Sequence, residues 1–390
     1  MLNYFTPDDE AYVIRIRREL HAIPELLFDL PKTVAVVKRE LDSMGIPYTE
    51  QYGQCSVVAT LNPNSKGPTV GLRADMDALP LEELADVPYK STHPGKMHAC
   101  GHDCHTAMLL GAARVMKRME SELPCRVKLL FQPSEEGAQS GAEMMVKNGV
   151  MDDIDFIFCE HVENGHLDAG QIGYFPGYYM AACHPYTVIF HGKSVHATLP
   201  QNGHDALAMA VKAYNDIYLM KARELDPFSN HVISVSSIQA GFAHNVIAET
   251  ATMLITFRFY EPELHEFVNN RIHQLCRNAA EELGGTVEFH DAISCPALYN
   301  DPSLTEKACT AARKVVGDQN VVPMLQKISS EDFAHYLQHK PGVILRIGTR
   351  NEAKGCTELA HTSHFMPDED GLINGCQLFV QFVMEFGEDQ

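Results

Sequence analysis

The densest group of side chains able to do chemistry lies in Met97–Thr106, with the sequence MHACGHDCHT. Neutral imidazole and thiolate bind zinc-like ions, and carboxylates suit harder ions such as manganese. Cys100 and His102 could reach one ion if the backbone turns at Gly101. Asp103 could then orient a ligating imidazole. A single histidine here could equally belong to a polar loop with reduced cysteines, but the whole cluster favours a metal site.

A second candidate is the acidic pair Glu135 and Glu136 within Phe131–Gly137, FQPSEEG. A strand running into this turn places two adjacent carboxylates at a strand end, where α/β proteins tend to build sites. One carboxylate could bind a cation while the other stays free to carry a proton. The alternative is an acidic pair that stabilises the start of the following helix through its dipole.

Two further segments supply histidines at a predicted strand end or in a loop. His161 follows a predicted strand at 154–159, and His361 and His364 both occur in Ala360–Phe365, AHTSHF. One cysteine, three histidines and one glutamate would together supply the ligands of a hydrolase that uses two metal ions. The pattern therefore predicts a metal site assembled from distant segments.

The elements that must position these residues alternate between helix and strand in the first part of the chain. Helices are predicted at 8–20, 32–44, 106–119 and 141–148, and strands at 56–61, 69–72, 126–131 and 154–159. Such alternation is typical of an α/β protein whose mostly parallel sheet is covered on both faces.

The pattern changes near residue 183 and returns near residue 293. Between them, strands are predicted at 185–191, 232–240 and 250–259, and helices at 205–221 and 264–283. This order favours a smaller α+β domain with an antiparallel sheet, similar to a split βαβ unit. Afterwards helices at 305–316 and 331–338 and a strand at 342–347 resemble the first part. We therefore expect a discontinuous larger domain (1–182 and 293–390) with a smaller one (183–292) inserted.

Composition and charge exclude several classes of protein. The chain has 390 residues with 45% hydrophobic content, enough for about two globular domains. Lys+Arg 31 against Asp+Glu 51 gives a net charge of -20, which argues against a nucleic-acid partner. No apolar run approaches the ~18 residues of a membrane span, and no secretory signal pattern is visible. The 11 cysteines include no CxxC pair, so we expect reduced thiols, a cytoplasmic location and no membrane partner.

Three long motifs resemble those of the aminoacylase/carboxypeptidase-type metallo-amidohydrolases: RADMDALP (Arg73–Pro80), MHACGHDCHTAMLLGAA (Met97–Ala113) and FQPSEEGAQSGAEMMVKNG (Phe131–Gly149). The similarity is greatest to the branch with hippurate hydrolases, indole-acetyl-amino-acid hydrolases and N-acetyl-diaminopimelate deacetylases. GKSVHATLP, AHNVIAET and HTSHFMPDED follow in the expected order, so the resemblance spans nearly the whole chain. It implies a metallopeptidase catalytic domain and an inserted ferredoxin-like domain that serves as a lid or for dimerisation.

The resemblance also implies roles for individual residues. It implies five ligands for two divalent ions (zinc, manganese or cobalt), namely Cys100, His102, Glu136, His161 and His361. Cys100 would bridge the ions, and Glu135 matches the catalytic general base. His196 matches a catalytic residue, and Asn245 matches a substrate-binding residue. In a dimer, His196 of the partner subunit could take the catalytic position of His196. Arg258 would bind a substrate carboxylate with its planar guanidinium.

The function implied is metal-dependent hydrolysis of the amide bond in N-acyl amino acids or small peptides, by a homodimer or higher homo-oligomer. A hydroxide held between the ions would attack, Glu135 would move the proton, and His196 would help to stabilise the oxyanion. The alternatives are a dipeptidase or carboxypeptidase of the same fold, a Cys-His nucleophile hydrolase using Cys100 or Cys104, and a non-catalytic metal-binding protein.

Two departures from the family pattern concern the metal ligands. Glu160 places an extra carboxylate directly before His161, where it could alter metal affinity or repel an acidic substrate. The segment HTSHF lacks the proline commonly found after the ligating histidine, so His361 is preferred over His364 only by its offset to Phe365.

Overall fold

The computed structural model describes residues 2–387, which form two compact units. The first unit contains the chain up to Gly177, Tyr299–Gln326 and the chain from Glu331 onward. The second contains Tyr178–Leu298 and Lys327–Ser330. The sequence places the insertion at 183–292, and the predicted outer boundaries at residues 1 and 390 fall outside the described residues. Each unit is described by itself.

The first unit is built on an eight-stranded sheet with the order β1-β2-β4-β3-β5-β14-β6-β13. These strands are β1 (Tyr48–Thr49), β2 (Val57–Leu61), β4 (Arg126–Gln132), β3 (Thr69–Asp75), β5 (Phe156–Asp168), β14 (Gly342–Arg350), β6 (Ile172–Tyr174) and β13 (Val321–Pro323). The central neighbours β4, β3, β5 and β14 run parallel to one another. The predicted α/β class with a mostly parallel sheet is confirmed.

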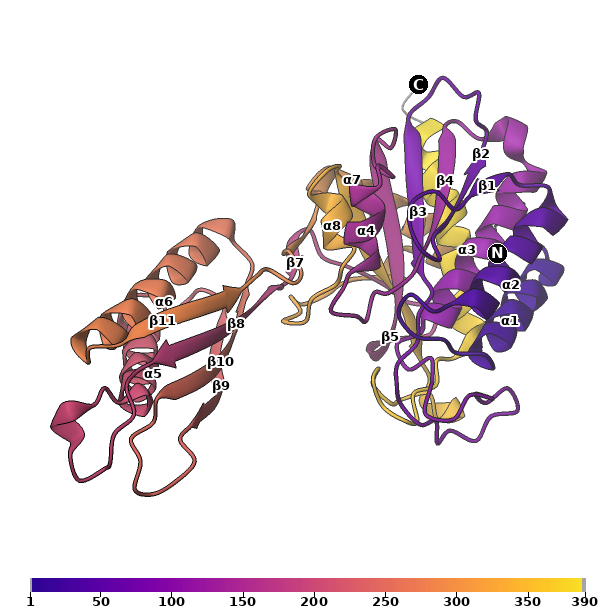
Figure 1. The fold of residues 1–390 in the computed structure, drawn as a ribbon. Helices are drawn as coiled ribbons and strands as arrows, with labels where there is room; N and C mark the ends of the chain where they lie inside the picture. Colours follow the sequence, from indigo (N-terminus) through magenta and orange to yellow (C-terminus); the bar gives the residue numbers. More distant parts are fainter. Residues whose placement is uncertain (1, 388–390) are drawn as a thin grey trace. The chain divides into compact units, whose positions relative to one another are not determined.

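Helices cover both faces of this sheet. They are α1 (Pro7–His21), α2 (Pro31–Met44), α3 (His102–Arg118), α4 (Gly141–Lys147), α7 (Pro302–Val316), α8 (Ala334–Leu337) and α9 (Leu372–Met384). Figure 1 shows α4 and α8 on one side of the strands and α1–α3 on the other. Every residue of β3 is consequently buried, as expected for a parallel strand with both faces covered. In the core, Phe158 of β5 stacks on Phe382 of α9 with 4.3 Å between ring centroids.

One strand that carries a site residue is longer than predicted. The sequence suggests an end at Cys159, whereas β5 continues to Asp168. β14 pairs with β5 in parallel from Ile157 to Glu163 and, after a register shift, again at Asp168, so the ladder supplies backbone hydrogen bonds well beyond the apolar run. His161 therefore lies inside a strand rather than just after one.

Other elements also differ from the prediction, among them two helices and an edge strand. α8 is restricted to Ala334–Leu337, so Glu331 and Asp332 precede it in a loop. α9 was not predicted, although its face is strongly apolar and buried. The edge strand β11 (Thr286–Asp291) was missed because its alternating residues are only half-buried or exposed.

The second unit is an antiparallel sheet with the order β11-β8-β10-β9, packed on α5 and α6 (Figure 1). Its further elements are β8 (Ala182–His191), β9 (Val232–Ala240), β10 (Thr250–Phe259), α5 (Ala206–Arg223) and α6 (Pro262–Glu282). Two short strands, β7 (Gly177–Met180) and β12 (Leu298–Asn300), lie where the chain passes between the units. Among residues 2–387, no helix is long and apolar enough to cross a membrane.

Candidate metal centre

The turn before α3 brings two ligand-type side chains together. Gly101 caps the helix with φ +93°, a left-handed conformation that glycine adopts without penalty. A Cβ at this position would lie 2.3 Å from Cγ2 of Val162, so no larger residue fits. The backbone thus turns at Gly101, which is the condition under which Cys100 and His102 could reach one ion. The ligand atoms of Cys100, His102 and His161 lie within 4.8 Å of one another.

This cap also explains why α3 begins ahead of its predicted start at Thr106. The sequence prediction followed the apolar periodicity, which begins only after the polar first turn. That turn is nevertheless buried, with His102, Asp103 and His105 each about 1% exposed. Its polar side chains are bonded to neighbours instead of water, so the helix can start at His102.

A second group of possible ligands shares Cys100 with the first. The ligand atoms of Cys100, Glu136 and His361 also lie within 4.8 Å of one another. His361 Nε2 is 3.2 Å from Glu136 Oε1, and the His361 backbone N–H donates to the Ala99 carbonyl at 2.7 Å. His361 has φ +67°, an uncommon conformation for a residue other than glycine. His364 is exposed and belongs to no such group among the described residues.

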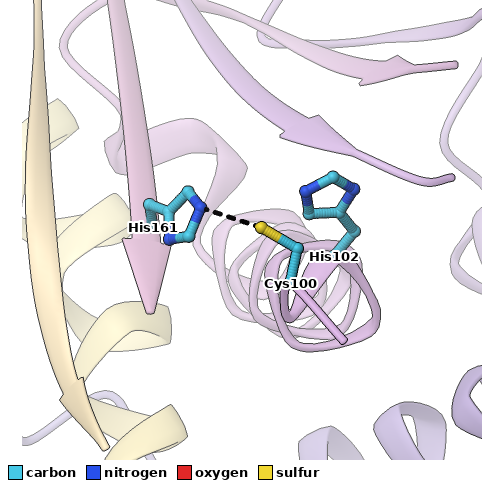
Figure 2. Close-up of side chains that lie close together, drawn as sticks. All are labelled: Cys100, His102 and His161. Carbon is cyan, nitrogen blue, oxygen red and sulfur yellow. Dashed lines mark hydrogen bonds between the residues drawn. The ribbon is translucent and has the colours of Figure 1, made fainter. Parts of the chain in front are cut away.

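Hydrogen bonds orient both buried imidazoles so that their Nε2 atoms face the cluster. His102 Nδ1 donates to the Asp77 carbonyl at 2.8 Å, and His161 Nδ1 donates to the Val162 carbonyl at 2.6 Å. Figure 2 shows His161 directed at Cys100, with 3.5 Å between Nε2 and Sγ. His102 Nε2 is buried without a hydrogen-bond partner in the described part of the chain. Such an arrangement is typical of metal-binding histidines.

Asp77 connects the two loops of the site. Its carboxylate oxygens accept the backbone N–H groups of Glu135 at 2.9 Å and Glu136 at 3.1 Å, while its carbonyl accepts from His102. The residue is 1% exposed. No role for Asp77 was predicted, although the motif RADMDALP places it just after β3, where a strand-end carboxylate is a recognisable signal.

His105 and Asp75 fix the strand that carries His161. His105 Nδ1 donates to Asp75 Oδ1 at 2.6 Å, and its Nε2 accepts the Val162 backbone N–H at 3.0 Å. These bonds link α3, β3 and β5 directly beside His161. The sequence cluster contained His105, but nothing in it indicated this supporting role.

Glu135 lies beside the ligand groups and belongs to neither group that contains Cys100. Its Oε1 accepts the Asp332 backbone N–H at 3.4 Å. Burial, followed by the nearby carboxylates of Glu331 and Asp332, raises the pKa of Glu135 well above its ordinary value. A carboxyl group whose pKa is raised in this way is suited to accepting and releasing a proton during catalysis.

A fully buried arginine holds those neighbouring carboxylates in place. Arg73 Nη2 lies 2.7 Å from Asp332 Oδ1 and 3.1 Å from Glu331 Oε1, and Nη1 donates to Asp75 at 2.6 Å. Asp332 also accepts from Ser140 Oγ at 2.6 Å. The acidic residues next to Glu135 are therefore held in place by ion pairs and hydrogen bonds.

The electrostatics of the ligand group fit a divalent cation. Burial and the Glu136 carboxylate raise the pKa of the Cys100 thiol well above its ordinary value. Burial opposes charge on His102, yet Asp75 and Cys100 raise the pKa of His102 well above its ordinary value. Burial and Arg346 lower the pKa of His161, which keeps its imidazole neutral and able to ligate. A bound cation favours thiolate and neutral imidazole, so it would supply the positive charge that this acidic cluster demands.

Glu160 does not face the site, contrary to the concern raised by its position in the sequence. Successive side chains of a strand point to opposite faces, so Glu160 and His161 diverge. Glu160 Oε2 packs against Gly375, where an added Cβ would approach within 2.6 Å. Burial raises the pKa of Glu160 well above its ordinary value. The Glu160 side chain is thus directed toward α9 and away from the ligand groups.

The remaining predicted residues belong to the second unit. His196 is exposed, its Nδ1 lies 2.7 Å from Thr198 Oγ1, and it forms a β-bridge with Val246 next to Asn245. Arg258 lies on β10, where its guanidinium contacts Cys183 Sγ and donates to Thr256 Oγ1. Their roles toward substrate stay predictions.

The comparison with known families shows the family to which this chain belongs. The model of peptidase family M20/M25/M40 matches residues 71–385. The chain belongs to this family. The resemblance to the aminoacylase/carboxypeptidase-type metallo-amidohydrolases is thereby confirmed, and the M20-family chain is a metal-dependent hydrolase that acts on amides.

Relatives of this M20-family chain match over almost its full length. Thermostable carboxypeptidase 2 of Saccharolobus solfataricus is 34% identical over 381 residues, 97% of this chain and 96% of the relative. IAA-amino acid hydrolase ILR1-like 4 of Arabidopsis thaliana is 35% identical over 379 residues, 96% of this chain and 86% of the relative. This chain also resembles the crystal structure of the Bacillus subtilis YXEP protein, which is described as a dinuclear metal binding peptidase from the M20 family. The two match with a TM-score of 0.82 and 29% identity, over 97% of this chain and 98% of the other. The fold is therefore one that supports two divalent ions.

Proposed function

We propose that this chain hydrolyses the amide bond of N-acyl amino acids or small peptides with two divalent ions that share the Cys100 sulfur as a ligand. The observation that carries the proposal is the membership of Cys100 in both ligand groups. His102 and His161 would hold one ion, and Glu136 and His361 the other. A pair of such ions polarises a carbonyl and lowers the pKa of water. Mixed sulfur, nitrogen and oxygen ligation tolerates several first-row ions, and zinc, manganese and cobalt are the candidates.

Glu135 is the proposed general base. It lies against the ligand groups, and its carboxylate is held by the Asp332 backbone N–H and faced by acidic neighbours. In this role it accepts a proton from the attacking water and then delivers it to the departing amine nitrogen. One residue thus serves both halves of the hydrolysis.

The substrate class is inferred from the chemistry and from the relatives. An N-acyl amino acid carries a carboxylate beside the scissile amide, and Arg258 provides a guanidinium for it. His196 and Asn245 would contact the reacting amide. A relative named as an IAA-amino acid hydrolase and another named as a carboxypeptidase support, respectively, an acyl-amino-acid substrate and a peptide substrate. We propose the acyl-amino-acid class first and short peptides second.

A panel of substrates tests the proposal. The protein, reconstituted in turn with Mn²⁺, Zn²⁺ and Co²⁺, is assayed on N-acetyl, benzoyl and indole-acetyl amino acids and on dipeptides. Glu135→Gln should lower kcat by about 10²–10⁴-fold while its metal content equals that of the wild type. Glu143→Gln, on the exposed side of α4, is the matched control and should keep full activity. An active Glu135→Gln enzyme, or one unable to hold metal, would contradict the assignment of Glu135.

We further propose that the protein forms a homodimer through its second unit and works in a reducing compartment such as the cytoplasm. α5 carries an exposed apolar stripe of Leu207, Val211 and Tyr214, between 38% and 45% exposed. β9 ends the sheet beside that helix with an unpaired edge among the described residues. None of the 11 cysteines, all within the described residues, forms a disulfide bond, which supports the reducing compartment.

A further inference from the structure

We propose that Cys183 and Cys295 form a dithiol that a low-molecular-weight disulfide oxidises to an intramolecular disulfide bond. Both residues belong to the second unit and lie outside the proposed metal centre. The proposal does not depend on the reaction that the enzyme catalyses.

The two cysteines lie directly opposite each other across one backbone bridge. Cys183, on β8, pairs antiparallel with Cys295, which follows β11. The Cys183 backbone N–H donates to the Cys295 carbonyl at 2.9 Å, and the Ser294 backbone N–H donates to the Cys183 carbonyl at 2.9 Å. Opposite residues of an antiparallel pair point to the same face with Cβ atoms about 4.5–5.5 Å apart. A disulfide needs about 3.5–4.5 Å between Cβ atoms, so a pairing of this kind places two cysteines close to the required separation.

The accessibility of the pair assigns an order to the reaction. Of the 11 cysteines, all within the described residues, only Cys55 and Cys183 are not buried. Cys183 is therefore the thiol that a reagent in solution meets first, whereas Cys295 is 7% exposed. The Arg258 guanidinium contacts the Cys183 sulfur from the neighbouring strand β10.

The chemistry balances in two exchange steps. The Cys183 thiolate attacks one sulfur of a reagent disulfide, forming a mixed disulfide and releasing one reagent thiolate. The Cys295 thiolate then attacks the Cys183 sulfur, forming the protein disulfide and releasing the second reagent thiolate. Two protein thiols are oxidised and one reagent disulfide is reduced to two thiols, with no other reactant required.

The bond would join the two ends of the second unit. Cys183 follows closely after the point where the chain enters that unit at Tyr178, and Cys295 comes shortly before the main segment ends at Leu298. Oxidation would thus fasten the incoming and outgoing passages to each other without touching the metal ligands.

The test is treatment of the folded, full-length protein with oxidised glutathione, followed by peptide mapping without reductant. The wild type should give a single linked peptide pair containing Cys183 and Cys295, which dithiothreitol reverses. Cys295→Ser should stop at a glutathione adduct on Cys183, and Cys183→Ser should leave Cys295 unmodified. Cys55→Ser, which removes the other accessible thiol, is the matched control and should behave as the wild type.

Two outcomes overturn the proposal. In one, wild-type Cys183 remains a glutathione adduct or stays unmodified while Cys55 reacts. In the other, Cys183 pairs with a cysteine other than Cys295. Thermal unfolding followed by circular dichroism shows whether each variant is folded. As a further control, the urea-unfolded chain is treated with oxidised glutathione in the same way. An unfolded chain favours disulfides between cysteines close in sequence, so a Cys183–Cys295 link found only in the folded protein reflects their proximity in the fold.

Discussion

At the scale of single residues, Asp77 illustrates how one side chain can determine the geometry of a site without ligating anything. Its two oxygens receive the N–H groups of Glu135 and Glu136, which are the proposed base and a proposed ligand. Its carbonyl orients His102 from the opposite side. The spacing between base and ligands therefore depends on a residue with no direct part in the chemistry.

Asp77→Asn should lower metal affinity by about 10–100-fold. The amide keeps the size of the carboxylate but places an NH₂ donor against a backbone N–H, so at least one of the two loop-fixing hydrogen bonds is lost. Competition with a chromophoric chelator measures the affinity. Asp86→Asn, at an exposed carboxylate of the same polypeptide segment, is the control and should leave affinity unchanged. Equal affinities for Asp77→Asn and the wild type would show that Asp77 does not position the ligands.

The residue types and their spacing were sufficient to predict the cluster around Cys100, but not the partners that support it. Asp77 acts on backbone N–H groups, and His105 acts on the amide of Val162, a residue distant in sequence. Such partnerships depend on which strands become neighbours. The offset to Phe365 favoured His361 over His364, but the left-handed backbone conformation of His361 has no signal in the side-chain pattern.

At the scale of secondary-structure elements, the start of α3 carries the site. The strands were predictable where apolar runs are continuous, as in β3 and β4. The predicted length of β5 was too short, because pairing with β14 rather than apolar residues stabilises its second half. The beginning of α3 was missed because its first turn is polar yet buried. Local sequence patterns report burial of apolar faces, whereas these two regions are stabilised by hydrogen bonds to distant partners.

Gly101→Ala should destabilise the protein more than Gly95→Ala. Both glycines have positive φ, +93° and +71°, so alanine costs about 1–2 kcal/mol at either position from backbone conformation alone. At Gly101 the new Cβ would also meet Val162 at 2.3 Å, whereas nothing lies within 4 Å of a Cβ at Gly95. Urea unfolding of the metal-free proteins measures both costs. Similar losses of unfolding free energy would mean that the close approach to β5 has no consequence.

At the scale of the whole molecule, each unit contains a core of its own. The first is organised around the eight-stranded sheet, and the second around β8, β10 and the two helices α5 and α6. The sequence indicated an insertion because alternating helices and strands gave way to an antiparallel pattern. The short segment Lys327–Ser330, which joins the second unit from far along the chain, had no such signal.

Val211→Glu on α5 should convert the proposed dimer to a monomer. A charge in the middle of the apolar stripe would have to be desolvated in the interface, which is unfavourable without a partner. Sedimentation velocity measures the oligomeric state. Phe267→Glu is the control, because Phe267 is 43% exposed and Val211 45% exposed. Phe267 lies on α6 at the opposite edge of the sheet, so this substitution should leave the dimer intact. A monomeric wild type, or an unaffected Val211→Glu dimer, would contradict the proposed interface.

The unequal burial of the two ligand groups has a kinetic consequence. His102 and His161 are 1% and 9% exposed, while the side chain of His361 is 55% exposed. On the proposed ligand set, His361 would hold the ion that water reaches more easily, and the two histidines would hold the more enclosed one. Loading and loss would then be sequential, so the enzyme would pass through a half-filled state whose inner ion is retained while the outer one equilibrates with the surroundings.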